Sequence, residues 1–286
     1  MVNDKGKASL FPLRLWLFSS AFFVIASLCV LFGYIFIQGG RELSLSFLTN
    51  TPQGFPLGVE GGIWPAIVGS FWFTTIACAF GSFLALPTAI FLAFYAKTTW
   101  IVSLCHFLIH SMAGIPSIIL GLFGYTFFVV TLGFGVSLLS GGLILGIMIF
   151  PFIEVRVEKT LLEFPNNITQ ASISLGITKT WTLFHLILPG CMGDIAKIIA
   201  LGGSFAMGAT APILFTGAVL FAPSPRSIFS PAMALPNHLY ILVGQGISIS
   251  KAYGTALVLI VLLLILNVVP LVINMCRKEG QDVPYS

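Results

Sequence analysis

The sequence predicts an all-α, polytopic membrane protein, on the evidence of its composition and of the length of its apolar runs. Of the 286 residues, 57% are hydrophobic and only 8% are charged, whereas a soluble domain carries about 25% charged residues. A chain this apolar could not cover its own surface in water. A bilayer core about 30 Å thick is crossed by about 20 apolar residues in a helix. We therefore expect a bundle of membrane-spanning helices surrounded by lipid.

Six apolar segments meet this length criterion and define one membrane domain over residues 13–286, behind a short tail at residues 1–12. The first segment is longer than the apolar core of a cleaved signal peptide, which runs for about 7–15 residues, so we expect it to be retained as a helix. The boundary between the third and fourth segments depends only on a short stretch around Gly133 and Gly135. The expected spans are about 13–38, 66–96, 100–131, 134–154, 194–220 and 252–276.

The distribution of basic residues orients these spans, because cytoplasmic segments of membrane proteins are enriched in Lys and Arg. With the N-terminus inside, all thirteen basic residues except Arg41, Arg226 and Lys251 fall on cytoplasmic segments. Both termini are therefore predicted to be cytoplasmic. The three long connections then lie outside, inside and outside the membrane, at residues 39–65, 155–193 and 221–251.

The inner connection, residues 155–193, is the most polar stretch and predicts a slender exposed helix. Pro165 precedes the helix, and Ala171 and Ser172 keep it thin. Gly176 can end it by adopting a left-handed conformation. The residues that follow form an apolar face that can pack back onto the membrane domain, namely Trp181, Leu183, Phe184, Leu186 and Ile187. A thin helix on an apolar arm is a shape suited to docking into a groove of a partner protein.

Motifs for catalysis and for nucleotide binding are missing from the sequence. No G-x-x-x-x-G-K-[ST] run is present, so any ATP that drives this protein must be bound by another chain. No G-x-S-x-G or H-E-x-x-H motif occurs, and we expect no paired carboxylates inside the membrane. The basic residues are scattered, which argues against nucleic-acid binding. We expect no enzymatic activity, and no cofactor or metal ion bound by this chain.

His106 and His110 are four residues apart in the third expected span, so their side chains lie on the same face of a helix. This spacing could hold a metal ion or serve a proton relay. A buried, hydrogen-bonded pair is the interpretation we favour, since buried polar groups usually find a partner. Asp194 and Lys197, three residues apart, read as a pair on the surface of the fifth helix.

The inner connection resembles the EAA motif of ABC importer permeases, which is roughly E-A-A-x-x-x-G followed about a dozen residues later by L-P. In that family the helix inserts into the ATPase subunit and transmits its closure. The resemblance therefore implies an ATPase-coupling role for this segment, with Gln where the family usually has Glu. The matching residues are Gln170, Ala171, Ser172, Gly176, Leu188 and Pro189.

Further motifs in the same order extend the resemblance to most of the chain and make it closest to phosphate-specific permeases of the PstA type. They are Gly61–Ile67, Gly114–Phe123, Gly208–Thr216 and Ala234–Tyr240 with Pro231. The resemblance implies a six-helix permease in the bacterial inner membrane that passes inorganic phosphate. Its expected partners are a PstC-like second permease, two PstB-like ATPase subunits, which hold ATP and Mg, and a periplasmic PstS-like binding protein.

The resemblance also implies which residues line the path of the anion. Where the family has an Arg and a Glu in the fifth helix, this chain has Phe205 and Ala209. Arg156 matches a family Arg just after the fourth helix; the alternative is a membrane anchor paired with the neighbouring glutamates. Small residues keep the fifth helix thin, and its proline is expected to kink it. The expected pathway residues are Arg156, Gly208, Thr210 and Pro212.

Three alternatives to phosphate import remain open. The chain could be an ABC permease for another small solute, or a membrane scaffold that transports nothing. An ion-coupled secondary transporter would need buried ionisable groups, and His106 and His110 are its only candidates.

Overall fold

The computed structural model describes residues 11–96 and 98–279, and most of them are helical. In this part of the chain, five helical stretches are long and apolar enough to span a membrane, and a sharply bent pair makes a sixth if counted as one span. The prediction of an all-α membrane protein is confirmed. Most of the tail at residues 1–12 lies outside the described residues. The five spans are Leu13–Glu42, Trp64–Tyr95, Leu138–Leu162, Lys179–Gly208 and Ile249–Ile273.

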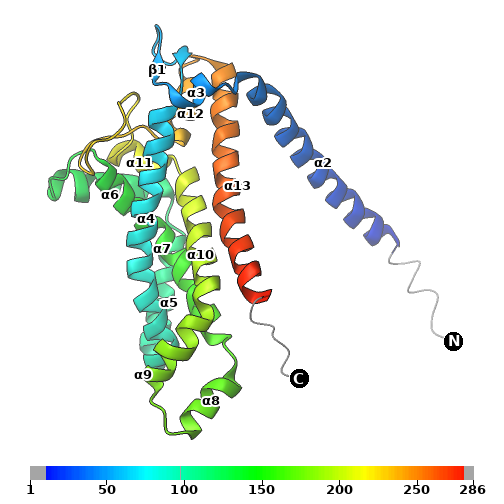
Figure 1. The fold of residues 1–286 in the computed structure, drawn as a ribbon, viewed down its shortest axis with the longest axis vertical. Helices are drawn as coiled ribbons and strands as arrows, with labels where there is room; N and C mark the ends of the chain where they lie inside the picture. The colour runs from blue at the N-terminus through cyan, green and yellow to red at the C-terminus, as the bar shows by residue number, and fades with distance from the viewer. Residues whose placement is uncertain (1–10, 97, 280–286) are drawn as a thin grey trace.

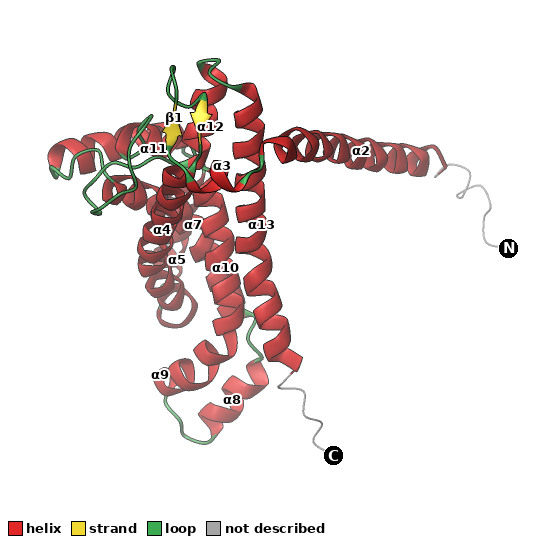
Figure 2. Cartoon of the chain, turned by 45° about the horizontal axis from the view of Figure 1, so that its top comes forward, coloured by secondary structure: helices red, strands yellow, loops and turns green. Residues whose placement is uncertain are grey.

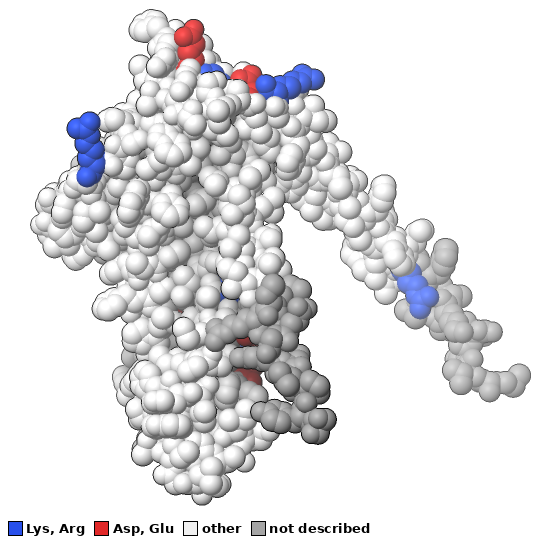
Figure 3. Space-filling view, viewed as in Figure 1, with Lys and Arg blue, Asp and Glu red and all other residues white. Residues whose placement is uncertain are grey.

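Helices α4 (Trp64–Ile90), α7 (Leu138–Leu162), α10 (Leu188–Gly208) and α13 (Ile249–Glu279) form the body of the bundle. Their charged side chains are few. The face drawn in Figure 3 is largely uncharged along its middle and carries acidic and basic groups at the end above it. This pattern fits a bundle that is surrounded by hydrocarbon along most of its length.

The contact between α4 and α7 is the closest in the core, and the two helices run parallel. Ala77 and Ala85 of α4 are fully buried. A side chain added at Gly81 would meet the Gly146 carbonyl oxygen at 3.0 Å and Ile149 Cγ1 at 2.9 Å. Small residues allow two backbones to approach this closely, which is how helices associate in lipid where hydrophobic burial contributes little. Helix α4 continues into a π-helical turn, η1 (Phe91–Tyr95).

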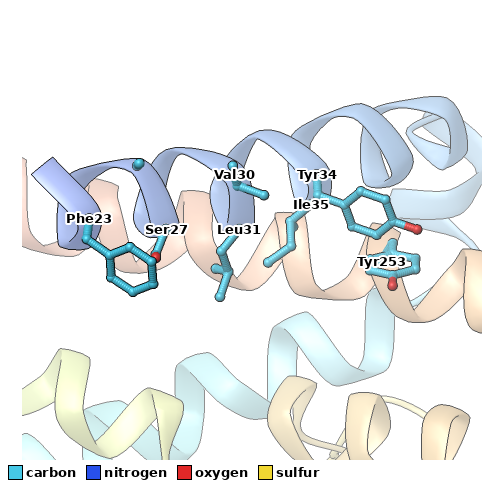
Figure 4. Close-up of a pocket in the computed structure, with 8 residues that line it drawn as sticks. Phe23, Ser27, Val30, Leu31, Tyr34, Ile35 and Tyr253 are labelled. Atoms are coloured by element: carbon cyan, nitrogen blue, oxygen red, sulfur yellow. The ribbon is translucent and has the colours of Figure 1, made fainter.

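Helix α2 (Phe11–Glu42) diverges from the bundle and packs on α13 near one end (Figures 1 and 2). The rings of Tyr34 and Tyr253 meet edge to face there, with centroids 5.4 Å apart. Beside this contact lies an open apolar notch of about 670 Å³, lined by seven residues of α2 and by Tyr253 of α13 (Figure 4). The α2 side of the notch carries Phe23, Leu31 and their neighbours, so most of the apolar surface of α2 is uncovered in this chain.

The third expected span, 100–131, is wrong as a single helix. Helix α5 (Thr99–Ala113) is followed by α6 (Ser117–Gly124) and a π-helical segment, η2 (Tyr125–Thr131), and the two halves are bent by 97°. Pro116 lies at the break. A proline pushes the residue before it out of the helical region, so the chain turns at Ile115 and α6 runs across one end of the bundle (Figure 1).

The fifth expected span, 194–220, is also wrong in its bounds. Helix α10 ends at Gly208, and a separate helix, α11 (Ala211–Thr216), follows. Pro212 lies in the first turn of α11, where its missing N–H costs nothing. The proline therefore begins a new helix rather than kinking a long one. The fourth span begins later than expected and runs past residue 154 to Leu162.

At the end of the bundle opposite helix α8 (Asn166–Ser174) lies a cap built from short elements. It contains α3 (Leu45–Thr49), an antiparallel hairpin of β1 (Pro52–Gln53) and β2 (Glu60–Gly61), and α12 (Leu235–Gly244). Two long-range hydrogen bonds tie the cap to the bundle. The Lys251 ammonium donates to the Gly61 carbonyl at 2.9 Å, and the Leu235 N–H donates to the Ser70 hydroxyl at 2.8 Å.

Acid is expected to destabilise this cap through His238. Burial, and to a smaller extent the nearby Lys251 charge, lower the pKa of His238 to about 4. The unfolded chain binds a proton near pH 6.5 and the folded chain does not, so stability is lost as the pH falls from about 6.5 to 4. We expect a slope of at most about 1.4 kcal/mol per pH unit, measured as thermal unfolding against pH. His238→Gln should flatten the profile; an unchanged slope would contradict the assignment.

Candidate functional site

The first candidate site is the short helix α8 (Asn166–Ser174), which projects at the end of the bundle opposite the hairpin (Figure 2). The thin helix expected after Pro165 is present. Gly176 follows it with φ of +80°, which is the left-handed conformation expected at a helix end. Of the predicted coupling residues, Gln170 and Ala171 are exposed on this helix. The predicted helix and its left-handed end at Gly176 are therefore confirmed, and both depend only on residues that are close in sequence.

A buried hydrogen bond joins α8 to the chain that follows it. Ser172 is only 4% exposed, and its hydroxyl lies 2.7 Å from the hydroxyl of Thr182 in α9 (Lys179–Thr182). Thr178 caps α9, since its side chain accepts the Trp181 N–H. Ser172 thus holds the slender helix in place and does not lie on its exposed surface. A contact ten residues apart across a turn could not be read from the motif.

The arm after α8 packs onto the membrane domain as expected. Leu183 and Ile187, in the π-helical turn η3 (Leu183–Ile187), belong to the main hydrophobic core. Trp181, which was expected to pack with them, is exposed and stacks on His185 with ring centroids 4.4 Å apart. Helix α10 continues directly from η3 and begins at Leu188 and Pro189. From Lys179 to Gly208 the chain is one long helical stretch, and the Ser172–Thr182 hydrogen bond ties α8 to its first turn.

The second candidate site is a pocket of about 340 Å³ formed by α5, α7 and α10. Its one cation is Arg156, whose guanidinium carbon lies 4.2 Å from the centre of the Phe152 ring. The Phe152 and Phe205 rings are stacked, with centroids 6.4 Å apart. The lining residues are His110, Ala113, Met148, Pro151, Phe152, Val155, Arg156 and Phe205.

Arg156 is not paired with either neighbouring glutamate, so the interpretation as an ion-paired anchor does not fit the geometry. Glu158 instead makes an ion pair with His106, whose Nε2 lies 2.9 and 3.1 Å from the two carboxylate oxygens. The guanidinium rests on an aromatic face, where cation–π attraction holds it without neutralising it. Arg156 therefore keeps its charge available to an anion in the pocket.

The expectation of no paired carboxylates within a span is wrong. Glu154 and Glu158 are one helical turn apart on α7 and both are buried. Glu154 is 0% exposed, and neither of its oxygens has a hydrogen-bond partner among the described residues. The error came from ending the fourth span at residue 154. The apolar pattern of α7 continues through Leu161, and this periodicity was the signal available.

The favoured interpretation of His106 and His110 as a buried, hydrogen-bonded pair is also wrong, because His106 is only partly buried and His110 is exposed. Their ring centroids are 6.3 Å apart, His106 bonds Glu158, and His110 lines the pocket beside Arg156. No group of three His, Cys, Asp or Glu side chains that could hold a metal ion occurs within residues 11–96 and 98–279. The two histidines thus have separate environments.

The other predicted pathway residues lie elsewhere, at the junction of α10 and α11. Gly208, Thr210 and Pro212 do not line the pocket that contains Arg156. Pro212 is buried against Gly121 of α6, where an added side chain would meet the proline Cα at 3.1 Å. The structure therefore separates the predicted pathway set into a pocket at Arg156 and a packed corner at Pro212.

No protein-family model matches the sequence, but individual relatives do. The chain is 28% identical over 282 residues to the probable ABC transporter permease protein YqgI of Bacillus subtilis, covering 93% of both chains. It is 32% identical over 229 residues to the probable phosphate transport system permease protein PstA of Methanocaldococcus jannaschii, covering 78% of this chain and 77% of that one. It is 30% identical to the phosphate transport system permease protein PstA 2 of Mycobacterium bovis, covering 79% and 76%.

The fold has a solved counterpart as well. The chain superposes on a chain of the MetNI methionine ABC transporter, in an inward-facing conformation, with a TM-score of 0.61 and 19% sequence identity, covering 74% of this chain and 92% of that one. This likeness concerns the fold, while the sequence matches give the family. The long apolar helices, the exposed helix α8 with its arm, and relatives of 30% and 32% identity agree: the chain belongs to the PstA-type family of ABC transporter permeases.

Proposed function

We propose that this permease passes inorganic phosphate across the bacterial inner membrane, with both termini in the cytoplasm. The relatives named as phosphate transport permeases support this substrate. The pocket containing Arg156 supports it chemically, because an anion moving through a low-dielectric region needs a compensating charge. Arg is also the side chain best matched to phosphate, since its planar guanidinium can donate two parallel hydrogen bonds.

The energy for transport would come from partner subunits that bind ATP and Mg. We place one of two PstB-like ATPase subunits at α8, a PstC-like permease with the other ATPase subunit beside this chain, and a PstS-like binding protein at the cap. Closure of the ATPases would move α8, and the helical stretch from Lys179 to Gly208 would carry that motion into the bundle. The chain itself would act as a transport subunit and not as an enzyme.

The pocket has fewer charges than the resemblance would give it. Phe205 occupies the position of a family Arg and contributes a ring to the wall. In the proposed assembly the PstC-like permease supplies the remaining positive charge, since the substrate passes between the two permeases. Arg156 is then this chain's main contribution to anion binding.

Arg156→Ala is expected to reduce ATP-dependent phosphate uptake by about tenfold or more, because it removes a charged hydrogen-bond donor worth about 1.5–3 kcal/mol. The measurement is uptake into proteoliposomes that contain the full complex. Arg156→Lys should reduce uptake less, since lysine keeps the positive charge but lacks the two parallel N–H donors of the guanidinium. Lys159→Ala, which removes an exposed cation one turn away, is the matched control.

Three results would contradict the proposal. Uptake unchanged by Arg156→Ala would remove the role given to this residue. Phosphate uptake that needs no ATP would point to an ion-coupled transporter. ATP hydrolysis that is stimulated only by another solute would show that this solute, and not phosphate, is the substrate.

A further inference from the structure

We propose that His110 is a second substrate-contacting residue in the Arg156 pocket, and that the His106–Glu158 ion pair positions it there. This inference rests on the proposed function, because the substrate it assumes is an oxyanion such as phosphate. It assigns a role to three residues that the sequence motifs leave without one.

The pocket around Arg156 has few hydrogen-bond donors in its lining. Of its eight side chains, only Arg156 and His110 bear N–H groups; the others are apolar. An oxyanion has several acceptor oxygens, and each needs a donor once water is left behind. An imidazole offers an N–H donor in either protonation state. His110 is therefore the second hydrogen-bond donor that this chain presents to an anion held at Arg156.

Helix α5 is attached to α7 by the contact between His106 and Glu158. Only Ile109 is buried among the residues of this helix, so apolar packing holds α5 weakly. One turn before His110, the His106 ring bonds both oxygens of Glu158, which is 8% exposed on α7. Residues four apart lie on the same face of a helix. The ion pair therefore fixes the face of α5 that carries His110 against the helix that carries Arg156.

The placement of the two donors on different helices has a consequence for transport. An anion bound between His110 and Arg156 bridges α5 and α7, while the Phe205 wall belongs to α10. Helix α10 is continuous with the arm of α8. A shift of α10 would change the space around the anion while the ion pair keeps its two donors together. His110 would therefore set the affinity of one state of the transport cycle.

The test is phosphate uptake by the complete complex in proteoliposomes, measured over a range of phosphate concentrations. His110→Leu should raise the half-saturating concentration by about tenfold, as expected for losing a hydrogen bond to a charged group. His110→Gln keeps an N–H donor and should stay within about threefold of the wild type. Ser111→Ala is the matched control, because that hydroxyl bonds only its own helix at the Phe107 carbonyl.

The positioning role has a separate readout. Glu158→Gln removes the charge of the ion pair and should raise the half-saturating concentration less than His110→Leu does. The double variant should be no worse than His110→Leu alone, because residues that act through one another are not additive. Full additivity of the two effects would overturn the positioning role.

The outcomes separate the inference from the proposed function. A wild-type complex that takes up no phosphate overturns the function. Wild-type uptake with an unchanged half-saturating concentration in His110→Leu overturns the inference alone, as does a lowered maximal rate without a change in half-saturation. If His110→Leu and the smaller His110→Ala both fail to assemble with the second permease, His110 is an interface residue and the inference is also overturned.

Discussion

Ala171→Arg is expected to release the ATPase subunits from the complex and to abolish ATP-driven uptake. Ala171 is exposed on α8, and a long charged side chain there would prevent a slender helix from entering a groove. The Ser172–Thr182 hydrogen bond faces the other way and stays intact, so the membrane domain should still fold. The measurement is the amount of ATPase that purifies with the tagged permease, with a loss of about tenfold or more expected for a steric and charge clash in a buried contact.

A control for this experiment places the same charge at the opposite end of the bundle. Ser250→Arg adds an arginine at an exposed position beside the cap and should leave the ATPase bound. Deletion of residues 170–176 is the more severe test. An ATPase that still purifies with the deleted chain would refute the coupling role, and so would labelling that places residues 165–190 on the periplasmic side.

Gly69→Leu is expected to prevent the membrane domain from folding stably. Any side chain at Gly69 would collide with the backbone carbonyl of Met233, where the start of α4 meets the segment leading into α12. The adjacent Ser70 accepts the buried Leu235 N–H, so movement here would also break a hydrogen bond. Overpacking at such a point costs about 1–3 kcal/mol, and the lost bond adds about 1–3 kcal/mol.

The measurement is the melting temperature of the detergent-solubilised protein, together with its yield as a single species in size-exclusion chromatography. Gly33→Ala is the matched control, because nothing lies within 4 Å of the added carbon and alanine favours a helix over glycine by about 0.5–1 kcal/mol. Equal melting temperatures for Gly69→Leu and the wild type would show that the cap can move away from α4.

The features that the sequence predicted correctly are those that depend on near neighbours. Apolar length gives the first, second and last spans to within a few residues, and the helix after Pro165 with its left-handed end at Gly176 follows from local turn chemistry. The exposed face of that helix at Gln170 and Ala171 follows from the same reasoning. These elements need no knowledge of the distant chain.

The features that were missed depend on contacts between distant segments. The bend at Pro116 and the new helix at Pro212 each required a choice between a kink and a break, which packing against other helices decides. The partner of His106 is 52 residues away on α7. Sequence spacing had paired it with His110, because only neighbours on one helix are visible without the fold.

The pocket illustrates the same limit and also what the sequence retained. Arg156 was expected on the substrate path, and it lines the pocket together with Phe205, a position singled out for the charge it lacks. His110 joins them only because α5 lies against α7, and the ion pair that holds it involves Glu158 beyond the expected end of the span. The sequence motif identified Arg156, but it could not identify the residues of other helices that line the pocket with it.

The helical stretch from Lys179 to Gly208, which includes the π-helical turn η3, would act as a lever in the proposed assembly. Thirty residues at about 1.5 Å each make a rod of about 45 Å, so every degree of tilt at the α8 end swings the far end by roughly 0.8 Å. A small tilt at the Lys179 end would therefore produce a displacement of several tenths of an ångström or more at the Gly208 end. There the helix meets α11, which begins near Pro212. In the proposed assembly, the stiffness of this helical stretch would set how much of each ATPase movement reaches the Gly208 end.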